Sequence, residues 1–67
     1  MDSVYKVIEI IGTSDQSWED AAKRAVEKAA KSLKDLRVAE VKELDIKIED
    51  GVFLYRVKLN VSFKYLD

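Results

Sequence analysis

The chain has 67 residues, of which 12 are basic and 13 acidic, and it contains neither cysteine nor histidine. Disulfides, thiolate metal sites and catalytic groups built on Cys or His are therefore excluded, and we expect a protein that is not an enzyme. The balanced charge argues against nucleic-acid binding, and no apolar run approaches the roughly 20 residues that a membrane helix needs. We expect one cytoplasmic domain over residues 1–67, without a signal peptide.

The first half of the chain contains two segments of different periodicity. Residues 4–11 are rich in β-branched side chains and end at Gly12, which predicts a strand. Ser17 and Asp20 form a weak capping box, and apolar residues then recur at helical spacing as far as Leu36. This pattern predicts one amphipathic helix of about 19 residues, roughly 28 Å long, with an apolar face made mostly of alanine.

The second half predicts two strands joined by a tight turn. Residues 38–49 are β-rich, but their apolar positions change from odd to even numbers at Lys42-Glu43, which indicates a β-bulge. Asp50-Gly51 is typical of a hairpin turn, and in residues 53–65 every odd position is apolar. The order strand, helix, strand, strand predicts an α+β fold in which the last strand lies between the other two and antiparallel to both.

The last strand is longer than the helix that can cover it. Residues 53–65 extend for about 40 Å, whereas the predicted helix extends for about 28 Å. Part of the apolar stripe therefore needs a cover that the chain does not supply. Hydrophobic residues make up 48% of this small chain, and both observations predict an obligate oligomer.

Several segments of the sequence resemble the dodecins, and together they extend over nearly the whole chain. They read YKVIEIIGTS (5–14), SWEDAA (17–22), RVAEV (37–41), YRV (55–57) and VSFK (61–64). The resemblance implies a β-α-β-β fold whose three-stranded antiparallel sheet is partly wrapped around one helix. It also implies a hollow homododecamer that binds or stores a small ligand without transforming it.

The dodecins that bind flavins stack the ring on a tryptophan in the second strand and hydrogen-bond it through a glutamine in the third. The matching positions here are Val38 and Arg56, with Glu40 as a polar neighbour. Valine has no π face, and arginine only donates hydrogen bonds. The sequence therefore looks closer to the branch without this tryptophan, which includes calcium dodecins. The resemblance implies a ligand site at Val38, Arg56 and Glu40, with riboflavin or FMN as the family's ligand.

A second interpretation assigns acidic residues of the second strand to a divalent cation. Calcium and magnesium take six or more oxygen ligands, so copies of the chain would have to meet at a symmetry axis to complete a site. Glu43 falls where some dodecins carry an acidic metal ligand near such an axis, and Asp45 lies close to it. In this interpretation the oligomer is a structural shell that carries calcium or magnesium and has no flavin function.

Two of these features also have purely structural explanations. Trp18 is expected to pack at the start of the helix or at a subunit contact rather than to bind a ligand. Arg56 and Lys58 lie on the polar side of the last strand, where either can form a salt bridge to Glu40 or Asp45 on the neighbouring strand.

Overall fold

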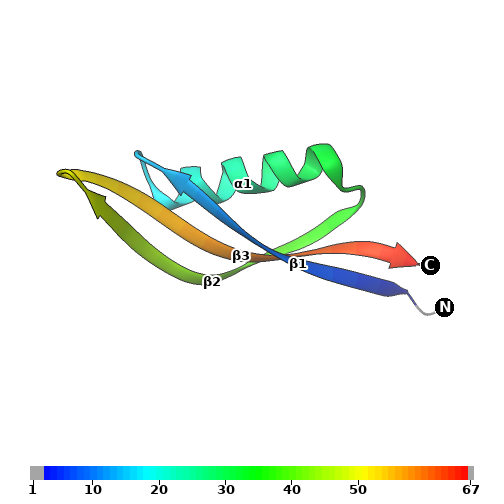
Figure 1. Cartoon of the computed structure of the whole chain (residues 1–67). Coiled ribbons are helices and arrows are strands. Elements are labelled where there is room, and N and C mark those ends of the chain that lie inside the picture. The colour runs from blue at the N-terminus through cyan, green and yellow to red at the C-terminus, as the bar shows by residue number, and fades with distance from the viewer. Residues whose placement is uncertain (1–2, 67) are drawn as a thin grey trace.

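A computed structural model describes residues 3–66 as one sheet with a helix on one face (Figure 1). Its elements are β1 (Val4–Ser14), α1 (Trp18–Ser32), β2 (Leu36–Glu49) and β3 (Val52–Leu66). The strand order is β1-β3-β2, and β3 is antiparallel to both of its neighbours. The predicted α+β class and the central position of the last strand are therefore confirmed.

Side-chain hydrogen bonds tie the start of α1 to the end of β1. The backbone N–H of Asp20 donates to the Ser17 hydroxyl at 3.0 Å, as the capping box predicts. The Asp20 carboxylate accepts from the buried Ser14 hydroxyl at 2.6 Å and from Arg24 Nε at 2.7 Å. The Ser14 hydrogen bond, supported by Arg24, lowers the pKa of Asp20 from its usual 3.8. The turn from strand to helix is thus fixed by polar contacts as well as by packing.

The helix is shorter than the periodicity predicts, and the prediction of about 19 residues is wrong. It contains 15 residues and ends at Ser32, because Leu33 has an extended backbone. Asp35 then adopts a left-handed conformation with φ of 59°, and Leu36 opens β2 opposite Phe63 of β3. The helical spacing of Leu36 is therefore coincidental. Among the described residues no helix is long and apolar enough to span a membrane.

The core lies where α1 crosses the middle of β3. Val57, Leu59 and Val61 are each 1% exposed, and Ala21 of the helix is fully buried against them. Both elements have 15 residues, which corresponds to about 22 Å of helix but about 50 Å of strand. Phe53, near one end of β3, is 53% exposed, and Tyr65, near the other, is 54% exposed. The predicted mismatch between strand and helix is confirmed.

Apolar side chains consequently remain on the surface of the single chain. It exposes 5133 Å², whereas a compact monomer of 7.7 kDa exposes about 4,300 Å². The excess arises from an elongated shape, 52 Å in its longest dimension and 14 Å in its shortest. The large apolar residues that are at least two-fifths exposed are Val4, Tyr5, Val7, Ile11, Val38, Val41, Leu44, Ile46, Ile48, Val52, Phe53 and Tyr65.

Candidate ligand-binding face

The predicted site residues lie on the outer face of the sheet, the face opposite α1. Val38 and Glu40 of β2 are paired with Ser62 and Asn60, which are even-numbered residues of β3. The buried residues of β3 are odd-numbered and face the helix, so their even-numbered neighbours, and the residues paired with them, face away from it.

A β-bulge brings the acidic residues of β2 onto this same face. The register with β3 shifts between Val41 and Glu43, which confirms the bulge predicted at Lys42-Glu43. Without the bulge, Glu40 and Glu43 would point to opposite sides of the sheet, because their separation is odd. The extra residue, Lys42, restores the alternation, so Glu43 and Asp45 share the outer face with Val38 and Glu40. The bulge is therefore the local feature that gathers the candidate ligands.

Two of the carboxylates on the outer face are paired with cations of β3. Asp45 accepts two hydrogen bonds from Arg56, at 2.6 Å from Nε and 2.8 Å from Nη2. This contact lowers the pKa of Asp45 and raises that of Arg56. Lys58 Nζ lies 3.3 Å from Glu43 Oε1, and the four residues line a cleft of about 230 Å³ together with Ile11. The expected salt bridge from Arg56 to Asp45 is confirmed, whereas Lys58 pairs with Glu43 and not with Glu40 or Asp45.

The other two predicted site residues share a separate groove. Val38, which is 61% exposed, and Glu40 line about 300 Å³ together with Val7, Asn60 and Ser62. The Ser62 hydroxyl donates to the carbonyl of Val38 at 3.4 Å. Sequence reasoning overlooked Asn60, although its even position in the alternating strand was a signal that it faces this side of the sheet.

The structure does not bring Arg56 to Val38 within one chain. Val38 is opposite Ser62, and Arg56 lies six positions earlier on the same strand β3, which is a separation of about 20 Å. A single pocket made by Val38, Glu40 and Arg56 would therefore need Arg56 from a second copy. Residues 3–66 also contain no group of three or more acidic residues close enough to hold a metal ion.

Trp18 lies on the helix side of the sheet, opposite the side chains of these residues, and contacts only the backbone of Asp45 among them. Its indole N–H donates to the carbonyl of Asp45 at 3.1 Å. Its ring meets that of Tyr55 edge-on, with 5.2 Å between the centroids. These contacts fix the start of α1 against β2 and β3, in agreement with the expected packing role.

The similarities to known proteins agree with this fold. The dodecin family model matches residues 4–66. Calcium dodecin from Mycobacterium tuberculosis is 57% identical over 63 residues, which cover 92% of this chain and 89% of that protein. Dodecin from Thermus thermophilus is 43% identical over 65 residues, which cover 96% of this chain and 94% of that protein.

Solved structures give the same result. The crystal structure of the M. tuberculosis calcium dodecin, described as having a novel calcium-binding site, aligns with a TM-score of 0.88 at 56% identity over 94% of this chain and 91% of that chain. Dodecin from Streptomyces davaonensis aligns over the full length of both chains with a TM-score of 0.91 at 26% identity. The chain therefore belongs to the dodecin family and is similar to the calcium dodecin, as its sequence segments predict.

Proposed function

We propose that this chain is a non-enzymatic subunit of a homo-oligomeric shell, twelve copies by family analogy, which binds calcium through the outer face of its sheet. The observation that carries the proposal is the bulge at Lys42, which places Glu40 and Glu43 on one face. The 57% identity to a protein named calcium dodecin supports the choice of cation. The replacement of the stacking tryptophan by Val38 removes the main contact that the family uses for flavin.

Glu40 and Glu43 are the two carboxylates best placed to bind an added cation. Glu40 forms no ion pair with any residue in the described range 3–66, and the Glu43 side chain is 67% exposed and held by a single contact to Lys58. Successive residues on one side of a strand lie about 7 Å apart, which is close enough for two carboxylates to share one ion. Asp45 is less available, because both of its oxygens accept hydrogen bonds from Arg56.

In the proposed oligomer, a second copy can supply the oxygen ligands that a single chain lacks at this calcium site. Calcium takes six to eight oxygen ligands, whereas Glu40 and Glu43 offer four carboxylate oxygens between them. Water or a symmetry-related copy provides the remainder. The chain also exposes about 800 Å² more than a compact monomer of its mass, which is close to one partner's share of a standard interface.

Calorimetric titration with calcium chloride, combined with thermal melts in calcium and in a chelator, tests the proposal. At free calcium of about 100 times Kd, binding stabilises the fold by about 2.7 kcal/mol, a rise in Tm of about 10–20 °C. Glu40→Gln and Glu43→Gln should each remove most of that rise, while Glu27→Gln on the exposed side of α1 should keep it. A parent protein that melts at the same temperature in calcium and in chelator is not a calcium protein.

The groove at Val38 favours a flavin as the second candidate ligand. Asn60 offers an amide there, with both a donor and an acceptor, beside Glu40 and Val38. Quenching of riboflavin fluorescence measures this binding directly. Val38→Trp with Arg56→Gln should raise the affinity at least tenfold, which corresponds to about 1.4 kcal/mol. The single Arg56→Gln variant shows whether Arg56 of a second copy takes part, and unchanged quenching in the double variant counts against this site.

A further inference from the structure

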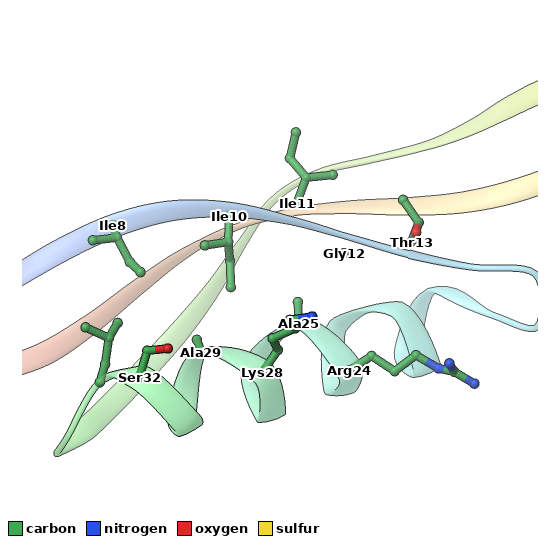
Figure 2. Close-up of a pocket in the computed structure, with 11 residues that line it drawn as sticks. Ile8, Ile10, Ile11, Gly12, Thr13, Arg24, Ala25, Lys28, Ala29 and Ser32 are labelled. Carbon is green, nitrogen blue, oxygen red and sulfur yellow. The ribbon is translucent and has the colours of Figure 1, made fainter.

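An open groove runs between β1 and α1 on the side of the molecule opposite the candidate ligand face. It has a volume of about 520 Å³, and its floor is apolar. Figure 2 shows Ile8 and Ile10 directed from β1 toward the helix and Ala25 and Ala29 directed back toward them. Leu33 also lines the groove. Nothing else in the described residues covers this surface, although its side chains are of the kind found in protein cores.

The rim of the groove carries one cation that is not neutralised. Arg24 and Lys28 lie one helical turn apart on α1 and both line the groove. Asp20 forms an ion pair with Arg24 at 2.7 Å, whereas Lys28 has no ion pair within residues 3–66. The amino end of Lys28 extends from the helix toward the side of β1 (Figure 2). Like charges at this spacing repel each other, so an additional anion beside Lys28 would be favourable.

The hairpin between β2 and β3 complements the groove, because it carries exposed apolar side chains and a negative charge. Ile48 and Phe53 are cross-strand partners on the helix side of the sheet and are 69% and 53% exposed. Asp50, in the turn, forms no ion pair in the described range, whereas its neighbour Glu49 contacts Lys47 at 3.6 Å. The hairpin projects beyond the end of β1 and beyond the start of α1 (Figure 1). The chain's own helix therefore cannot cover these apolar side chains.

We propose that the β2–β3 hairpin of a second copy occupies the groove between β1 and α1. Ile48 and Phe53 would lie on the apolar floor, and Asp50 would approach Lys28. The groove is open, whereas pockets for small molecules enclose about 70–90% of their ligand, so a protein segment fits it better. This inference rests on the homo-oligomer of the proposed function and names the two surfaces that meet in it.

The contact joins two different surfaces of the chain, and two kinds of symmetry satisfy it. Two copies can exchange hairpin and groove reciprocally across a two-fold axis, or each copy can offer its hairpin to one neighbour and its groove to another around a ring. In both cases Lys28 of one copy meets Asp50 of another.

Zero-length carbodiimide cross-linking of the intact oligomer tests the contact directly. The reagent joins an amine to a carboxylate that touches it, and a mixture of ¹⁵N-labelled and unlabelled chains separates links between copies from links within one. A mixed-label peptide that joins Lys28 to Asp50 is the expected product. A set of inter-copy links that omits this pair would overturn the proposal.

Charge reversal provides the second measurement, by size-exclusion chromatography with light scattering over a dilution series. Lys28→Asp and Asp50→Lys should each weaken assembly about tenfold, or about 1.4 kcal/mol, and the double variant should recover most of the loss. Lys23→Asp, an equal charge change on α1 outside the groove, should assemble like the parent. If the double variant does not recover, the pairing is wrong. Calcium titration of the same samples shows independently whether the ligand proposal holds.

Discussion

The close approach of β1 to α1 makes Gly12 the residue whose enlargement should disturb the fold most directly. A Cβ at this position would overlap the backbone carbonyl oxygen of Ala21 and lie 2.8 Å from the Cβ of Ala25. The Ala21 oxygen belongs to the helix backbone and cannot rotate away as a side chain can. Gly12→Ala must therefore push the strand and the helix apart in the middle of the core.

The expected cost follows from the rigidity of that contact. Overpacking a core costs about 1–3 kcal/mol, and we expect the upper end because the obstacle is backbone. A domain of this length is stable by about 3–10 kcal/mol in total, so the variant loses a large part of its stability. Each kcal/mol shifts the Tm of so small a domain by about 4–8 °C, which predicts a fall of about 12–24 °C.

Thermal unfolding followed by circular dichroism measures this fall, at one protomer concentration so that the proposed assembly contributes equally to every Tm. Thr13→Ala is the matched control: Thr13 is the next residue, its side chain is exposed, and its replacement should change the stability by less than about 0.5 kcal/mol. Adding Ala25→Gly to Gly12→Ala removes the smaller clash only and should not restore the parent Tm. If Gly12→Ala has the same Tm as the Thr13→Ala control, the helix does not lie this close to the strand.

Three further predictions concern the turn, the helix start and the tryptophan. Gly51 has a φ of 76° with open space around it, so Gly51→Ala should cost about 1–2 kcal/mol through backbone strain alone, measured by denaturant unfolding. Ser14→Ala removes the hydrogen bond that lowers the pKa of Asp20. A lowered carboxyl pKa stabilises the fold above the unfolded value and loses that effect as the pH falls. The parent should therefore exceed Ser14→Ala in stability at pH 7, and the difference should shrink below about pH 4, as pH-dependent melts will show. Trp18→Phe removes the N–H that donates to the carbonyl of Asp45 and should cost about 1 kcal/mol in urea unfolding; no loss would mean that the indole is held by packing alone.

Most of the fold was predictable because it depends on local patterns. The alternation in residues 53–65 predicted the long central strand, and the change of phase at Lys42 predicted the bulge, since both depend only on which side of a strand each residue faces. The end of the helix was not predictable in this way. Leu36 continues the helical spacing, but its place opposite Phe63 and the left-handed backbone of Asp35 place it in the sheet. Tertiary pairing overrides periodicity at such a boundary.

The candidate site was predictable only in part, because it depends on the register between strands. Glu43 and Asp45 were recognised as acidic neighbours, but their pairing with Lys58 and Arg56 requires knowledge of which residues of β3 lie opposite. Because of the same register, Arg56 lies far from Val38. Asn60 lines the groove at Val38, where the arginine was expected. A family motif gives the positions that matter in the assembled protein, and those positions need not meet within one chain.

The bulge in β2 and its pairing with the long strand β3 together decide which face of the sheet each side chain of β2 occupies. One added residue, Lys42, moves the acidic half of β2 to the outer face, and the same shift returns Leu44 to the helix side, where it is 51% exposed beside Trp18. If Lys42 took a regular place in the ladder instead, the two sets would be exchanged, with the carboxylates beside apolar neighbours and leucine on the candidate ligand face. Deletion of Lys42 should preserve the arrangement, because Val41 is already opposite Leu59 and Glu43 is opposite Lys58, the next residue of β3. A shift of β2 by one residue against β3 would break the Arg56–Asp45 and Lys58–Glu43 pairs together. Ligand binding and folding thus depend on a single register, and a variant that alters it should lose calcium binding and assembly in the same step.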